Sequence, residues 1–173
     1  MPFVVHPLIK SDTIVSRTYQ ETILNTASKR NTLCVLPTGL GKTTLAILLA
    51  AHRMEKYTDS KVLITAPTRP LCAQHQKTFK ECMSIPEEEI ILLTGQIPSE
   101  KRIDMYRDAR IINATPQTID NDLRNRTFDL SDFSLLIVDE CHRTVKKYAY
   151  PFVAKIYTEN AKNPRILGLT ASP

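Results

Sequence analysis

The sequence predicts an α/β fold in which a mostly parallel sheet carries helices on both faces. Short runs of β-branched and apolar residues alternate with longer amphipathic segments along all 173 residues. The runs are nearly all apolar, which is typical of strands buried on both faces of a parallel sheet. The connections are short, as in folds built from right-handed strand–helix–strand crossovers. Because this length suits one core, a single domain is expected over residues 1–173.

The periodicity sets out the expected elements in order. We expect strands at residues 32–36, 61–66, 90–94, 110–114, 134–138 and 165–169. We expect helices at residues 18–29, 42–57, 70–83, 98–108, 116–124 and 148–159. Three of these helices begin at a proline, whose missing N–H costs nothing in the first helical turn. Ligands bind beyond the carboxyl ends of parallel strands, so the residues after each run are the functional candidates.

Composition and charge favour a folded protein with a polyanionic partner. Hydrophobic residues make up 42% of the chain and charged residues 24%, which excludes a disordered tail. No apolar run approaches the ~20 residues that span a bilayer, and the N-terminus lacks a secretory pattern. We therefore expect no membrane partner and a cytoplasmic location, or a nuclear one in a eukaryote. The net charge of +5 fits nucleic acid but is too small to establish it.

The cysteines give no sign of a metal site. Cys34, Cys72, Cys82 and Cys141 form no C-x-x-C pair and have no suitably spaced histidine pair nearby. A disulfide framework is also unusual in a chain of this size. We interpret all four as small, partly buried thiols.

The residues after the first run form a phosphate-binding motif. They are Pro37, Thr38, Gly39, Leu40, Gly41, Lys42, Thr43 and Thr44. Glycines let the backbone curl so that N–H groups face phosphate oxygens, and the following helix adds its positive end. The pattern G-x-x-x-x-G-K-[ST] is met except at its first position, where Leu36 stands. We expect Lys42 to reach the β- and γ-phosphates and Thr43 to hold Mg²⁺; the alternative is a chance match in a loop.

Two acids, Asp139 and Glu140, follow the fifth run. Carboxylates at the end of a buried strand need a partner, and Mg²⁺ is a suitable one. Asp139 would hold the metal through water, and Glu140 would polarise the water that attacks the γ-phosphate. The alternative is an acidic helix N-terminus favoured by the helix dipole. The presence of the Lys42 loop in the same chain favours the catalytic interpretation.

With Cys141 and His142, these acids form a DECH box, and the chain resembles superfamily 2 helicases of the DExH type from about Arg17 to Pro173. The other matching segments follow in the family's order: Arg17 to Gln20, Ala66 to Leu71, Leu93 to Gly95, Ala114 to Thr118, and Thr170 to Ser172. The resemblance implies a RecA-like P-loop domain that binds ATP and Mg²⁺ and acts as an ATP-dependent helicase.

The resemblance also assigns roles to residues outside the phosphate loop. Gln20 would hydrogen-bond the adenine edge with help from Arg17, although both could simply be polar residues of a surface helix. His142 would couple the ATP site to Thr170 or Ser172, although a histidine here could equally be a buried supporting residue.

A further group would contact nucleic acid. By resemblance, this group consists of Arg69, Thr94, Gly95, Thr115 and Gln117. Such contacts reach phosphates and carry little sequence information. Thr115 and Pro116 also fit a plain helix N-cap and first position, and both interpretations hold together because a helix N-terminus is itself a phosphate site. A basic cluster of Arg143, Lys146 and Lys147 is interpreted as a solvated charged face.

Within the superfamily, the chain is most similar to the branch of archaeal Hef and the Fanconi anaemia M-type helicases, related to Dicer and the RIG-I-like receptors. This implies action on forked or branched DNA. An RNA-directed DExH helicase, an ATP-dependent nucleic-acid sensor and a plain P-loop switch are the alternatives. The family places ATP against a second RecA-like lobe, whose arginine fingers are worth roughly 10³–10⁵ in rate at related sites. We expect this lobe alone to bind nucleotide weakly and hydrolyse it at a negligible rate.

Overall fold

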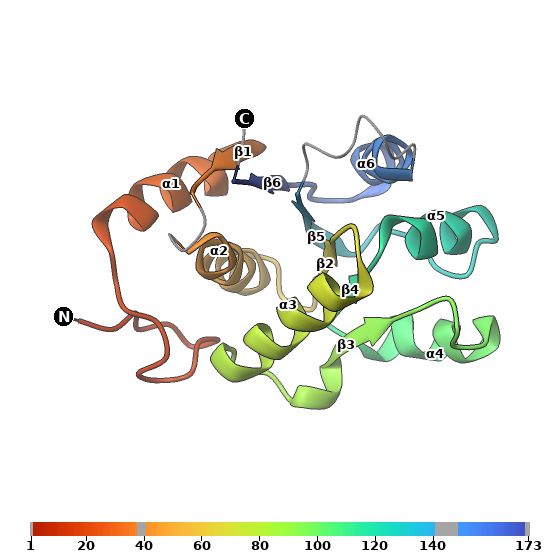
Figure 1. Ribbon diagram of the computed structural model, residues 1–173, viewed down its shortest axis with the longest axis horizontal. Coiled ribbons are helices and arrows are strands. Elements are labelled where there is room, and N and C mark those ends of the chain that lie inside the picture. The colour runs from red at the N-terminus through yellow and green to blue at the C-terminus, as the bar shows by residue number, and fades with distance from the viewer. Residues whose placement is uncertain (1, 38–40, 141–148, 172–173) are drawn as a thin grey trace.

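The computed structural model describes residues 2–37, 41–140 and 149–171, and its strands form one parallel sheet (Figure 1). The sheet has the order β1-β6-β5-β2-β4-β3, and each pair of neighbours is parallel. The strands are β1 (Thr32–Val35), β2 (Lys61–Thr65), β3 (Ile90–Leu93), β4 (Ile111–Ala114), β5 (Phe133–Asp139) and β6 (Ile166–Thr170). The expected fold class is confirmed.

Helices connect the strands as the periodicity predicts. They are α1 (Thr18–Lys29), α2 (Lys42–Lys56), α3 (Arg69–Cys82), α4 (Ser99–Asp108), α5 (Pro116–Arg124) and α6 (Ala149–Asn160), with a short 3-10 turn, η1 (Glu87–Glu89). Their bounds and those of the strands agree with the expected ranges to within one residue at each end. Within the described ranges, every helix is too short or too polar to cross a bilayer.

Alternate residues of each inner strand feed two separate cores. On β2, Val62 and Ile64 join α1, α2 and α3 in the first core, while Leu63 joins α4, α5 and α6 in the second. On β5, Ile137 and Leu136 divide in the same way. Successive strand residues point to opposite faces, so a strand covered on both sides must be apolar throughout. This explains the continuous apolar runs.

The expectation that every run is buried on both faces is wrong for β1. Leu33 and Val35 are 61% and 43% exposed, whereas Cys34 between them is buried. The strand lies at the edge of the sheet, and only the α1 side covers it, because the second core draws its strand residues from β2 to β6. Exposure therefore follows from strand order, which the composition of the run does not encode.

An N-terminal segment, residues 2–16, packs across the first core without forming a regular element. Ile9 bridges to Met83, and the N–H of Lys10 donates to the carbonyl of Cys82 at 2.7 Å. The N–H of Ser84 donates back to the carbonyl of Leu8 at 2.9 Å. These bonds hold the segment against the C-terminal end of α3. It has no periodic pattern, and no structure was expected for it.

Candidate nucleotide site and nucleic-acid interface

The strand order divides the carboxyl edge of the sheet into two halves. The expected phosphate, metal and coupling residues follow β1, β5 and β6, which are neighbours at one end of the order. The expected nucleic-acid residues follow β2, β3 and β4, which are neighbours at the other end. The boundary runs between β5 and β2. The two groups of residues are thus separate in space and meet at one pair of strands.

Gly41 shapes the start of α2. It is the N-cap residue, with a left-handed φ of 86°, and α2 begins at Lys42. A Cβ on Gly41 would lie 2.4 Å from Nε2 of Gln20. Glycine therefore suits the left-handed backbone conformation, and a larger residue would also displace the end of the Gln20 side chain. This contact joins the expected base-binding residue directly to the expected phosphate loop.

A cavity of about 320 Å³ opens beside this contact. Arg17, Gln20, Gly41 and Thr44 line one part of it, so the structure brings together residues that were assigned to one ligand. A guanidinium, an amide and a hydroxyl can together hydrogen-bond the edge of a planar polar ring.

The other wall of this cavity was not foreseen. It consists of Thr13, Ile14 and Val15 from the N-terminal segment, with Cys82 from the end of α3. Burial raises the pKa of the Cys82 thiol above its ordinary value. No local pattern marks these residues, because they reach the cavity only through the packing of the segment against α3. A slightly larger cavity, about 370 Å³, lies around Ser60 and Ser134 at the opposite edge of the sheet, away from the expected site residues.

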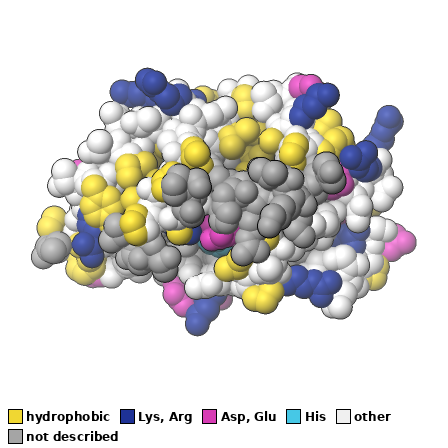
Figure 2. All heavy atoms as spheres, turned by 45° about the horizontal axis from the view of Figure 1, so that its top comes forward, with side chains coloured by type: hydrophobic (Ala, Val, Ile, Leu, Met, Phe, Trp, Pro, Cys, Tyr) yellow, Lys and Arg dark blue, Asp and Glu magenta, His cyan; other side chains and the backbone are white. Residues whose placement is uncertain are grey.

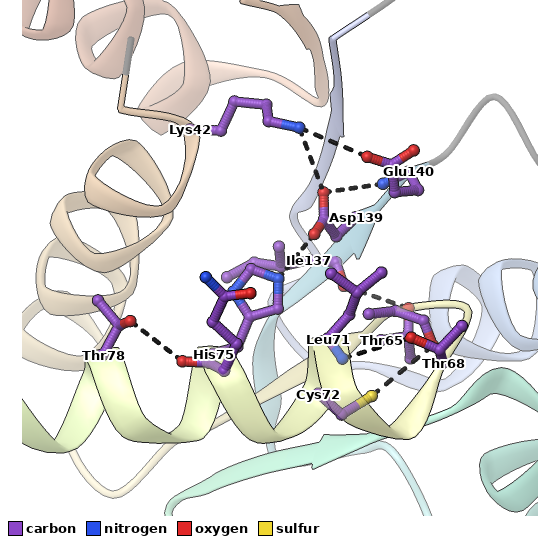
Figure 3. A network of polar contacts seen from close by, with 12 residues as sticks. Lys42, Thr65, Thr68, Leu71, Cys72, His75, Thr78, Ile137, Asp139 and Glu140 are labelled. Atoms are coloured by element: carbon purple, nitrogen blue, oxygen red, sulfur yellow. Dashed lines mark hydrogen bonds and ion pairs between the residues drawn. The ribbon is translucent and has the colours of Figure 1, made fainter. Parts of the chain in front are cut away.

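Lys42 lies close to both acids (Figure 3). Its Nζ is 3.6 Å from Oε1 of Glu140 and 3.9 Å from Oδ1 of Asp139. Glu140 has a left-handed φ of 57°, so the chain turns sharply as β5 ends. One cation and two carboxylates therefore converge at the carboxyl edge from elements that are far apart in sequence.

Asp139 is buried and held by hydrogen bonds on both oxygens. Oδ2 lies 2.7 Å from Nε2 of His75, and Oδ1 accepts from the N–H of Glu140 at 2.8 Å. Burial alone would raise the pKa of Asp139, but the hydrogen bond and charge of His75, with the charge of Lys42 and the Glu140 N–H, hold it below the ordinary value. The carboxylate is therefore ionised at neutral pH. His75 was not foreseen, because a histidine inside an amphipathic helix carries no motif.

The donor set suits a metal–nucleotide complex. Thr43 in the first turn of α2 and Asp139 offer hard oxygen ligands of the kind that Mg²⁺ prefers. The start of α2 and the Lys42 ammonium suit phosphate oxygens. Of the other expected site residues, Pro37 is exposed two residues after the end of β1. Thr38, Gly39, Leu40, His142 and Ser172 lie outside the described residues.

Thr170 lies between the two strands that carry the nucleotide-site residues. It is 1% exposed at the end of β6, which separates β1 from β5. Its carbonyl accepts from the N–H of Leu36 at 3.0 Å, and its neighbour Leu169 is in register with Asp139. This position, between the phosphate loop and the acids, suits the coupling role that the resemblance implied.

The second half of the edge presents helix starts and a loop. Arg69 is the exposed first residue of α3, after the N-cap Thr68, whose Oγ1 accepts from Leu71 N–H at 3.3 Å. Gln117 is exposed in the first turn of α5, and Gly95 is exposed after β3. In Figure 2 the coloured Lys and Arg side chains stand in separate groups near the rim of the face shown.

Thr94 and Thr115 are partly buried at the same half of the edge. Thr115 is the N-cap of α5 and Pro116 its first residue, as expected. The Thr115 hydroxyl lies 3.2 Å from Oγ1 of Thr118 and makes no bond to a helix N–H. The Thr115 side chain therefore does not cap the N–H groups of Gln117 and Thr118 in the first turn of α5.

Comparison with known proteins gives consistent matches. The sequence profile described as DEAD/DEAH box helicase matches residues 17–173. A protein of Methanocaldococcus jannaschii, named as an ATP-dependent RNA helicase, is 48% identical over 171 residues. The DEAD-box ATP-dependent DNA helicase Fancm of Drosophila melanogaster is 37% identical over 172 residues. The Hef helicase domain of Pyrococcus furiosus has a TM-score of 0.92 and 47% identity.

These matches span nearly all of this chain but a small part of the relatives. The coverage of this chain is 99%, 97% and 96% for the three proteins. The chain corresponds to 22% of the Methanocaldococcus protein, 12% of Fancm and 35% of the Hef helicase domain.

Proposed function

Because this chain belongs to the DEAD/DEAH box helicase family, we propose that it is the ATP-binding lobe of an ATP-dependent DNA helicase that acts on forked or branched DNA. The family membership agrees with the resemblance drawn from the motifs. The observation that carries the proposal is the convergence of Lys42 with Asp139 and Glu140 at the carboxyl edge of the sheet. A phosphate-binding lysine beside two ionisable acids is the arrangement that phosphoryl transfer to water requires.

Each residue of the nucleotide half has a separate task in this proposal. Lys42 would bind the β- and γ-phosphates, and the Thr43 hydroxyl and the Asp139 carboxylate would hold Mg²⁺. When bound there, Mg²⁺ would supply positive charge that offsets the negative charge on the phosphates. Glu140 accepts a proton from the attacking water and orients it in line with the bond that breaks. Gln20 and Arg17 bind the base in the cavity that they line.

The other half of the edge supplies the nucleic-acid interface. Arg69, Gly95 and Gln117 are exposed at the ends of three neighbouring strands, so a single strand laid along this edge would meet all three. Thr94 and Thr115 add hydroxyls in the same row. Contacts of this kind position a sugar–phosphate backbone and are not selective for base sequence. A second lobe, proposed from the family architecture, would close on the nucleotide and couple its hydrolysis to movement.

DNA is preferred over RNA as the substrate class because the Fancm match is named as a DNA helicase. The Hef similarity, at a TM-score of 0.92, supports the same branch of the family. RNA is the second candidate, because the Methanocaldococcus relative at 48% identity is named as an RNA helicase. The two differ at the 2′-OH, which a backbone-reading interface can detect.

The test compares nucleic acids as activators. ATP turnover is measured for the full-length protein with equal concentrations of forked DNA, single-stranded DNA and duplex RNA, with Lys42→Ala as the inactive control. We expect the largest stimulation with forked DNA and none in the control. Stimulation by RNA alone would move the function to the RNA-directed branch, and turnover that survives Lys42→Ala would refute the assignment of the nucleotide site.

A further inference from the structure

His75 connects the two halves of the carboxyl edge at their boundary. It lies in α3, which starts at Arg69 on the nucleic-acid half, and its Nε2 reaches Oδ2 of Asp139 at 2.7 Å (Figure 3). The side chains of both residues are less than a tenth exposed. An ionised carboxylate only accepts hydrogen bonds, so the proton of this bond is on Nε2.

The two oxygens of Asp139 have different surroundings. Oδ2 faces His75, whereas Oδ1 faces Lys42 and accepts from the N–H of Glu140. The bond from His75 thus fixes the rotation of the carboxylate about its Cβ–Cγ bond. With Oδ2 occupied, Oδ1 is directed to the side where Lys42 and the start of α2 lie (Figure 3).

Among the described residues, the bond to Asp139 is the one hydrogen bond that the His75 ring makes in the structure. Its Nδ1 is buried and has no hydrogen-bond partner in the structure. A buried polar atom without a partner is unfavourable, and an apolar side chain of similar size would avoid it. The histidine is therefore poorly explained as a core residue and well explained as a donor to Asp139.

We propose that His75 is a positioning residue for the metal site: its bond to Oδ2 holds the Asp139 carboxylate with Oδ1 turned toward Lys42 and the start of α2, where Asp139 would help to hold a divalent cation. The inference rests on the proposed function, because it concerns the metal ligand named there. Residues that orient metal ligands in this way are worth about 10–100-fold in metal affinity.

The test uses three substitutions that differ in where they place a donor. In His75→Gln the amide nitrogen can reach the position of Nε2, in His75→Asn it stands nearer the position of Nδ1, and His75→Leu has no donor. Mn²⁺ affinity is measured by electron paramagnetic resonance with saturating non-hydrolysable ATP analogue. We expect the Kd for Mn²⁺ to rise about tenfold or more in His75→Leu and His75→Asn and to stay near the parent value in His75→Gln.

A matched control comes from the next residue of the same helix. Gln76 donates from Nε2 to the carbonyl of Ile90 at 3.1 Å, so Gln76→Leu also removes one side-chain hydrogen bond of α3. We expect Gln76→Leu to leave the Kd for Mn²⁺ unchanged, and circular dichroism checks that each variant is folded.

The outcomes separate this inference from the proposed function. If the parent chain binds Mn²⁺ and the analogue, and His75→Leu and His75→Asn have the same metal affinity as the parent, the inference alone is overturned. An equal loss in Gln76→Leu also overturns it, since the effect would then be a general loosening of α3. If the parent chain binds neither the analogue nor the metal, the proposed function is overturned, and so is the inference that rests on it.

Discussion

Arg102 and Asp122 join α4 to α5 through a buried ion pair. Nη2 of Arg102 lies 2.7 Å from Oδ1 of Asp122, and Nε lies 2.9 Å from Oδ2. The hydroxyl of Tyr106 donates to the same carboxylate, and Nη1 of Arg102 donates to the carbonyl of Ile97. Asp122 is fully buried. The pair therefore ties the loop that contains Thr94 and Gly95 to the helix that presents Gln117.

Removing this carboxylate should unfold the domain readily. Asp122→Ala would leave the Arg102 guanidinium buried without its counter-charge, and breaking such a pair costs about 3–5 kcal/mol. Asp122→Ala would also remove the acceptor of the Tyr106 hydroxyl. That hydroxyl is buried and stays protonated, since burial and the bond to Asp122 raise its pKa well above the usual range. The free energy of unfolding in urea measures the loss.

The control for that variant lies two residues away. Asp120 pairs with the exposed Arg124 four residues later at 2.6 Å. An exposed pair of this spacing is worth about 0.3–0.5 kcal/mol, so Asp120→Ala should cost little. Equal losses of unfolding free energy in the two variants would show that the buried pair of Arg102 and Asp122 does not stabilise the domain more than an exposed pair does.

Gly41→Ala should damage both stability and nucleotide binding. An L-residue with the left-handed φ of 86° costs roughly 1–2 kcal/mol. The added methyl group would also press on the Gln20 amide, which lies within 2.4 Å of the Cβ position. Calorimetric titration with ATP and Mg²⁺ should show weaker binding. Unchanged affinity in a stable variant would argue that Gln20 and Gly41 do not form part of the nucleotide site.

Gly95→Ala should weaken nucleic-acid binding without lowering the stability of the folded chain. A Cβ at Gly95 would meet no atom within 4 Å, and its φ is not left-handed. The change should therefore leave stability unchanged or raise it by about 0.4–1 kcal/mol. If a nucleic-acid backbone passes close to this glycine, the methyl group should weaken binding, as measured by fluorescence anisotropy of labelled DNA. Binding equal to the parent's would remove Gly95 from the interface.

The lowered pKa of Asp139 predicts a dependence of stability on pH. Because this carboxyl has a folded pKa below its ordinary 3.8, its ionised form stabilises the folded chain. The contribution is fully present above pH 3.8 and is lost as the pH falls through the lower folded value. Parent chain and Asp139→Asn should thus differ most in unfolding free energy near neutral pH, and the difference should shrink below pH 4. A constant difference from pH 6 to pH 3 would contradict this.

Local pattern determined the elements and the motif residues of this chain. Apolar runs and helical periodicity act within a few residues, so the bounds of α1 and α5 were predictable without any knowledge of their neighbours. The phosphate loop before Lys42 and the acids at Asp139 and Glu140 were predictable for a related reason. Their chemistry requires particular residue types at adjacent positions, and the carboxyl ends of parallel strands share one edge.

Only the tertiary structure decided which of these residues meet. The exposure of Leu33 follows from the edge position of β1, and the wall of the base cavity follows from the N-terminal segment packing on α3. His75 and Asp139 are 64 residues apart and meet because β2 lies beside β5. Strand order is set by how whole layers of side chains pack, which is a property of the complete core and leaves no mark on the short segment around either residue.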